Sequence, residues 1–176
     1  MISEFFYQIA NLKTTQRSGW KSKLNLSDSE SVAEHTYMMS VMAMVLSDIK
    51  NLNTEKIIKM SLLHDWAESK IGDFMPGEVT NEEKNGLEEK AMIEILSNLP
   101  DKIQNDYYSI WNDYSNNISL ESKFVHQLDK LEMVLQAKIY QKGGAPTEAV
   151  ESFFKSAESE ITHSKLKEIL NQILQD

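Results

Sequence analysis

The chain has 176 residues, 41% of them hydrophobic and 26% charged, a composition that excludes a disordered or fibrous protein. Its formal net charge of −9 argues against binding nucleic acid through a broad basic surface, because such binding depends on clustered Lys and Arg. With no cysteine, disulfides and thiolate metal sites are excluded, which leaves His and carboxylates as candidate metal ligands.

Hydrophobic residues recur at helical spacing along most of the chain, which predicts an all-α fold. The first helix is predicted over residues 3–12. The polar stretch that follows, 13–31, has no regular pattern. Ser27 and Glu30 have the spacing of a capping box, which predicts that the second helix begins near them and runs to about Lys50.

A third, central helix is predicted over residues 54–71, because its segment IIKMSLLHDWA is almost continuously apolar and should be buried on most sides. Gly72 should end this helix. Thr80 and Glu83 form a second capping-box pattern, which predicts the start of the next helix, and that helix should reach about Asn98.

The last third of the chain also follows a helical pattern. Pro100 suits the first turn of a helix, and residues 120–141 form a long amphipathic helix that should stop at Gly143-Gly144. Two shorter helices are predicted over 146–157 and 159–175. The series of predicted segments contains no internal repeat and no pattern of β-strands.

We therefore predict one domain over residues 1–176, in which residues 146–176 pack on the core as C-terminal helices. The N-terminal segment has an acid where a signal peptide carries basic residues, and no stretch approaches the length of a membrane span. These features, together with the absence of cysteine, predict a cytoplasmic protein with neither a membrane nor a nucleic acid as partner.

His35 is the first polar residue that needs an explanation. It shares a helix face with Val32, Met39 and Met42, and this face should be buried. A single buried His needs only a hydrogen-bond partner, so His35 taken alone favours a structural role over metal binding.

His64 and Asp65 are adjacent within the apolar segment LLHDWAE, where a buried carboxylate is costly unless a positive group compensates it. A histidine followed by an aspartate also occurs by chance, and it is the apolar surroundings that favour metal ligands. Asp129 interrupts another apolar stripe, in FVHQLDKLEMVLQA. Two imidazoles and two carboxylates in one small core predict a divalent metal site formed by His35, His64, Asp65 and Asp129.

Four nearby residues have weaker or open interpretations. Glu68 lies one helical turn after His64, where it would act on a metal-bound water, bind a second ion, or simply hydrogen-bond to His64. Asp73 is either a loop acid or a group at the mouth of the same cleft. His126 is left outside the site as a surface or supporting residue, and His163 is expected to be exposed.

The order of His35, His64-Asp65 and Asp129 resembles the H…HD…D pattern of the HD-domain phosphohydrolase superfamily. The segments RSGW, ESVAEH, HDWAE, IGD and KFVHQLDKLE are similar to its 5'-deoxynucleotidase branch, over roughly residues 5–142. This resemblance implies an HD-domain helical bundle with a core of five or six helices and a homodimer. It also implies hydrolysis of deoxyribonucleoside 5'-monophosphates with Mn²⁺, Co²⁺ or Mg²⁺.

The resemblance also implies roles for individual residues. Arg17 would orient the phosphate, Glu68 would assist proton transfer or hold a second ion, and Asp73 would contact the substrate or that ion. In the proposed chemistry Asp65 would orient the attacking water as well as bind metal. Trp20 would contact the sugar, although in the bacterial members the Trp follows the Arg directly, whereas two residues intervene here.

Two alternatives to a deoxynucleotidase stay open at the level of the sequence. One is an HD hydrolase of another nucleotide phosphoester, such as a cyclic nucleotide or an alarmone. The other is a non-catalytic helical interaction module in which the metal only stabilises the fold. The metal site of such a module would be closed to solvent. The loop-like sequence around Arg17, Trp20 and Asp73 favours an open site.

Overall fold

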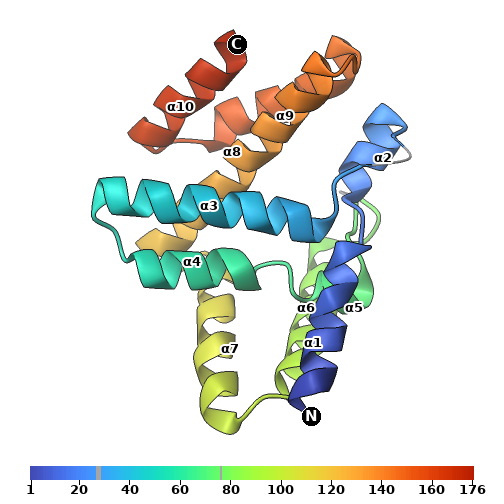
Figure 1. Cartoon of the computed structure of the whole chain (residues 1–176), viewed down its shortest axis with the longest axis vertical. Coiled ribbons are helices and arrows are strands. Elements are labelled where there is room, and N and C mark those ends of the chain that lie inside the picture. The colour runs from blue at the N-terminus through green and yellow to red at the C-terminus, as the bar shows by residue number, and fades with distance from the viewer. Residues whose placement is uncertain (27–28, 76) are drawn as a thin grey trace.

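The computed structural model describes residues 1–26, 29–75 and 77–176, which form ten α-helices and one 3₁₀ helix (Figure 1). In chain order these are α1 (Ile2–Ala10), η1 (Asn11–Lys13), α2 (Ser18–Leu24), α3 (Val32–Lys50), α4 (Thr54–Leu63), α5 (Glu68–Ile71), α6 (Asn81–Leu96), α7 (Asp101–Ser115), α8 (Leu120–Lys142), α9 (Thr147–Glu160) and α10 (Ser164–Gln175). Gln16 and Ser31 form an isolated antiparallel β-bridge. The predicted all-α fold is confirmed.

Helices α3, α4 and α8 pack on one another at the centre of the bundle, where α3 crosses the middle of Figure 1 and α4 lies beside it. The largest hydrophobic cluster joins these three helices to α9 and α10. Its fully buried members include Met39, Ile57, Met60, Leu128, Leu131 and Leu166. A second cluster holds α1 and α5 against α6 and α7 at the other end. The predicted metal ligands lie on or directly beside α3, α4 and α8.

The prediction of one continuous helix over 54–71 is wrong at the position that carries His64 and Asp65. Helix α4 ends at Leu63, turns follow over 64–67, and α5 begins at Glu68. The His64 Nδ1 atom donates to the backbone oxygen of Ser61 at 2.6 Å, and this oxygen would accept from Asp65 N in a continuing α-helix. The interruption allows the two side chains to turn toward the same point.

The start of α3 also differs from the prediction. Val32 is its first residue, and the capping box is formed by Ser31 and Glu34. Ser27, which belongs to the predicted capping box, lies outside the described residues, so that pairing stays a prediction. The irregular stretch 13–31 contains η1 and α2, and Trp20 therefore lies on a helix and not in a loop.

Other predicted boundaries agree within a few residues. Gly72 follows the end of α5 at a positive φ of 79°, and α8 ends at Lys142, directly before Gly143. The predicted break at 157–159 is displaced, because α9 continues to Glu160 and α10 begins at Ser164. No helix in the described part of the chain is long and apolar enough to span a membrane.

The predicted capping box at the start of α6 is confirmed and can be tested by stability. The Thr80 side chain accepts from Glu83 N at 3.2 Å, and Glu83 accepts from Thr80 N at 2.9 Å. We expect Thr80→Ala to lower the free energy of unfolding by about 1 kcal/mol in chemical denaturation, because the cap is lost. Thr80→Ser keeps the hydroxyl and should lose much less; equal losses would contradict this role.

Candidate active site

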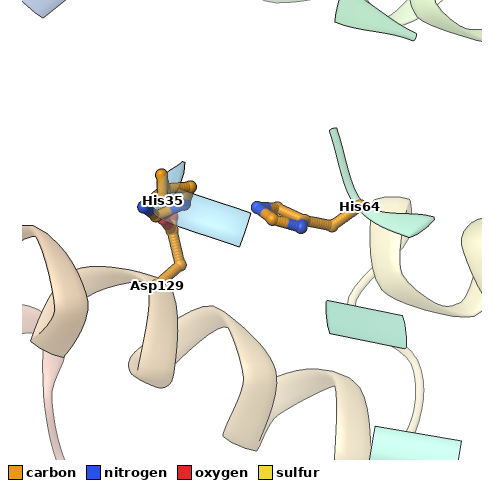
Figure 2. A group of neighbouring side chains, drawn as sticks. All are labelled: His35, His64 and Asp129. Atoms are coloured by element: carbon orange, nitrogen blue, oxygen red, sulfur yellow. Dashed lines mark ion pairs between the residues drawn. The ribbon is translucent and has the colours of Figure 1, made fainter. Parts of the chain in front are cut away.

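The structure brings the four predicted ligands together from different elements. His35 comes from α3, His64 from the end of α4, Asp65 from the turn after it, and Asp129 from α8. His35 Nε2 lies 3.1 Å from Asp129 Oδ1, and His64 Nε2 lies 3.0 Å from Asp65 Oδ2. Figure 2 shows the His64 ring pointing toward His35 and Asp129.

The donor set fits a divalent cation. Both Nε2 atoms are buried, and although each lies near a carboxylate oxygen, neither makes a well-aligned hydrogen bond among the described residues, a costly arrangement unless another group engages them. One ligand atom each from His35, His64 and Asp129 lies within 4.8 Å of the others. Ligands about 2.1 Å from one ion are roughly 3 to 3.5 Å apart, close to the distances between the His and Asp atoms here.

The other ring nitrogens are occupied, which sets the orientation of both imidazoles. His35 Nδ1 donates to Glu132 Oε2 at 2.5 Å, and His64 Nδ1 donates to Ser61 O at 2.6 Å. Each ring therefore presents Nε2 to the group of ligands. Burial and the charge of Arg17 lower the pKa of His35, but the neighbouring acids Asp129 and Glu132 outweigh them and raise it to about 10.

Arg17 lies against the same carboxylates. Its Nη1 is 3.3 Å from Asp65 Oδ2, and its Nη2 is 3.7 Å from Asp129 Oδ1. Burial raises the pKa of Asp65, but the charges of His64 and Arg17 outweigh it and lower the value to about 2. Burial also opposes ionisation of Asp129, yet His35 and Arg17 hold its pKa well below the usual range. Both acids are therefore ionised at neutral pH.

Glu68 is the first residue of α5 and is almost completely buried beside the cluster. Its Oε2 has no hydrogen-bond partner in the described part of the chain, and no hydrogen bond to His64 is found there. Burial, together with the charges of Asp65 and Asp73, raises the pKa of Glu68 well above its ordinary value. Glu68 therefore keeps a proton at pH values where an exposed Glu has lost it.

Asp73 holds the segment that carries Arg17. Its Oδ2 accepts from Ser18 N at 2.7 Å, at the first residue of α2, and its backbone oxygen accepts from the Ser18 hydroxyl. Arg17 N donates to Glu30 O at 3.1 Å on the other side. Asp73 thus lies at the site, but it also fixes the backbone beside Arg17.

Trp20 is only 2% exposed and lies on the wall of the cavity described below. Its indole Nε1 donates to Glu30 Oε1 at 2.8 Å, and its ring packs against Phe153 and Tyr140 at centroid distances of 4.4 and 5.2 Å. Most of this side chain therefore serves the packing of α2 on α8 and α9. Contact with a sugar stays a prediction.

A cavity of about 440 Å³ opens onto the cluster. Asp65 and Asp129 retain exposed fractions of 15% and 22%, so solvent reaches the carboxylates. Several polar groups that line this cavity are not among the site residues predicted from the sequence: Asn81, Lys84, Asn85, Glu88, Tyr114 and Lys130. Four of these lie on α6 at spacings of three and four residues, a pattern that an ordinary solvated helix face also shows.

The two histidines excluded from the predicted ligand set have different surroundings. His126 lines the cavity, donates from Nε2 to Tyr114 O at 2.9 Å and stacks on the Tyr114 ring. His163 is partly buried at the start of α10, where its ring meets Phe124, so the expectation that it is exposed is wrong. Neither belongs to the group of possible ligands around His35 and His64.

Comparison with known proteins gives a family match over most of the chain. Residues 9–170 match the HD-domain family. The chain belongs to this family. It is 34% identical to human 5'-deoxynucleotidase HDDC2 over 97% of this chain and 83% of the relative. It is 36% identical to the Dictyostelium discoideum protein of the same name, over 98% of this chain and 96% of the relative.

Solved structures of other proteins have the same fold. A conserved hypothetical protein from Pyrococcus furiosus is 26% identical, with a TM-score of 0.79 over 98% of this chain and 99% of that one. A predicted metal-dependent phosphohydrolase from Magnetospirillum magnetotacticum superposes with a TM-score of 0.71 at 21% identity. Family membership and the His–Asp cluster together indicate a divalent-metal centre.

Proposed function

We propose that this HD-domain protein is a metal-dependent phosphomonoesterase that hydrolyses deoxyribonucleoside 5'-monophosphates to deoxynucleoside and phosphate. The observation that carries the proposal is a cluster of two buried imidazoles, two ionised carboxylates and one Arg, onto which an open cavity leads. The relatives named 5'-deoxynucleotidase support this substrate class, because they match this chain over nearly its whole length.

His35, His64, Asp65 and Asp129 would hold the cation, which would polarise the phosphate and lower the pKa of the attacking water. The resemblance to enzymes that use Mn²⁺, Co²⁺ or Mg²⁺ supports one of these ions. Asp65 is ionised and accepts a hydrogen bond from the attacking water. If two ions bind, Glu68 and Asp73 would be the additional ligands, and the Glu68 Oε2 atom, which has no hydrogen-bond partner among the described residues, supports this arrangement.

Arg17 and Glu68 supply the remaining steps of the proposed mechanism. The Arg17 guanidinium donates to two phosphate oxygens and stabilises the charge that they carry in the transition state. As the water oxygen bonds to phosphorus and the ester bond breaks, the 5'-oxygen needs a proton. Burial near Asp65 and Asp73 raises the pKa of Glu68 well above its ordinary value, which favours its protonated form, and Glu68 delivers this proton to the leaving oxygen.

The charges around the cavity favour a monophosphate. Among the described residues, the cavity is lined by five acidic residues and three Arg or Lys residues. The acidic residues are Asp65, Glu68, Asp73, Glu88 and Asp129, and the basic ones are Arg17, Lys84 and Lys130. Lys84 pairs with Glu88 at 3.3 Å, and Lys130 pairs with Glu160 at 3.5 Å. One Arg and one or two cations suit a phosphate dianion, whereas a triphosphate brings further negative charge without free bases to meet it.

A nucleotide panel tests the proposed substrate class. We expect phosphate release from deoxyribonucleoside monophosphates in the presence of Mn²⁺ or Co²⁺ to be at least about tenfold more efficient than from the corresponding diphosphates and triphosphates, because each uncompensated charge disfavours binding. The rates for matched ribonucleotides and deoxyribonucleotides are also compared, since a contact of Trp20 with the sugar should make the two rates differ. Equal or faster hydrolysis of triphosphates would show that the site is built for another substrate.

The open cavity argues against a purely structural metal site, which would be closed to solvent. A single domain over residues 1–176, a homodimer and a cytoplasmic location belong to the same proposal. The packing of α9 and α10 on α8 supports the first, and the resemblance to homodimeric enzymes supports the second. The net charge of −9 supports a small-molecule substrate over nucleic acid.

A further inference from the structure

Two acids that the proposed mechanism does not use lie next to His35. Glu132 is 1% exposed, and Glu30 is partly buried. Ligand atoms of Glu30, His35 and Glu132 lie within 4.8 Å of one another. A buried carboxylate is costly unless a strong hydrogen bond or a positive charge compensates it, so this pair needs an explanation.

Glu132 is tied to the edge of the His35 ring that carries Nδ1. Its Oε2 accepts from this nitrogen at 2.5 Å, while Nε2 of the same ring lies 3.1 Å from Asp129 Oδ1. Glu132 and Asp129 are three residues apart on α8, so one helix provides both contacts. The two nitrogens therefore meet different acids, and the bond to Glu132 fixes which nitrogen faces the proposed ion.

Glu30 has a different donor. Its Oε1 accepts from the Trp20 indole at 2.8 Å, and its backbone N donates to the Tyr140 hydroxyl at 2.8 Å. Since Trp20 compensates Glu30 and His35 compensates Glu132, both acids have donors within the protein. This arrangement favours a hydrogen-bonded support over a second cation held by Glu30, His35 and Glu132.

We propose that Glu132 is a positioning residue for the metal centre: it holds the His35 ring with Nδ1 as donor and Nε2 directed at the ion. Its negative charge also makes the imidazole a better ligand. The inference rests on the proposed metal site but not on the identity of the substrate.

Metal affinity in the purified full chain tests this role without any measurement of hydrolysis. We expect Glu132→Gln to weaken Mn²⁺ binding by about 10–100-fold in competition with a chelator, because the charge is lost, and Glu132→Ala to weaken it at least as much. Val134→Ala is the matched control, since Val134 is a fully buried core residue on the same helix. It should lower thermal stability and leave Mn²⁺ affinity within about twofold of the parent.

The proposal fails if Glu132→Gln lowers thermal stability as Val134→Ala does but keeps the affinity of the parent for Mn²⁺. It also fails if Glu30→Gln removes one equivalent of bound Mn²⁺, since a cation would then occupy the place of the bond between His35 and Glu132. A parent protein that binds no Mn²⁺ would overturn the metal site itself and this inference with it.

A spectroscopic readout without added metal tests the hydrogen bond directly. In the parent protein we expect a low-field proton resonance from His35 Nδ1, because a short bond to a carboxylate deshields this proton. Glu132→Ala should remove the resonance or shift it upfield, and Val134→Ala should leave it in place. An unchanged resonance in Glu132→Ala would contradict the assignment of Glu132 as the partner.

Discussion

His64→Ala and Asp129→Ala are each expected to abolish metal binding and hydrolysis together. Each substitution removes one of the proposed ligands of the ion. Because the ligands act together, the remaining ones cannot make up for the loss of one. We expect the rate of phosphate release to fall by about 10³-fold or more, and bound metal to fall to background in elemental analysis. Thermal stability should fall as well, because the remaining buried acids lose their compensating charge.

His163→Ala is the matched control for these variants. His163 is partly buried at the start of α10 and lies outside the group of possible ligands, so its loss should leave the metal content unchanged. Full metal retention by both His64→Ala and Asp129→Ala would exclude them as ligands. Loss of metal in His163→Ala as well would show that the effect arises from general destabilisation.

Arg17→Ala is expected to lose catalysis while it keeps its metal and helix content. Removal of a donor that stabilises charge in the transition state costs about 2–4 kcal/mol, or roughly 30- to 1000-fold in kcat/KM. Metal binding should not weaken, because the positive charge of Arg17, 3.3 Å from Asp65, opposes a cation at the same acids. Arg17→Lys should recover only part of the activity, since an ammonium cannot donate in two parallel bonds.

Lys90→Ala, on the exposed face of α6, removes a positive charge away from the cavity and serves as the control for Arg17. It should keep kcat/KM within about twofold, because surface charges are screened. A catalytic efficiency of Arg17→Ala within twofold of the parent would show that Arg17 does not serve the phosphate. A loss of bound metal in Arg17→Ala would show instead that Arg17 helps to hold the metal ligands in place.

The helical pattern of the sequence was sufficient to predict the bundle, because the apolar stripes of α3, α4 and α8 decide which faces are buried. The same pattern did not predict the helix break at His64. At the break after Leu63, Ser61 O contacts His64 Nδ1, a side-chain bond to the backbone that hydrophobic periodicity does not report. The apolar run therefore predicted one helix where there are two.

The convergence of the predicted ligands could be inferred because His35, His64 and Asp129 interrupt apolar stripes, where a polar residue needs an explanation. Glu132 and Lys84 gave no comparable signal. In a sequence, a single Glu or Lys on an amphipathic helix looks like a solvated side chain. Glu132 meets His35 only because α3 packs on α8, and Lys84 reaches the site only because α6 lies beside the cavity. Such contacts depend on tertiary structure.

The most direct test measures bound metal and hydrolysis in the same samples of the full chain. The protein is stripped with a chelator, reloaded stepwise with Mn²⁺, and assayed for phosphate release from a deoxyribonucleoside 5'-monophosphate. We expect no hydrolysis by the stripped protein and a rate that rises in proportion to the Mn²⁺ bound. Hydrolysis at the full rate without metal, or none of the monophosphate at any metal loading, would contradict a metal-dependent phosphomonoesterase.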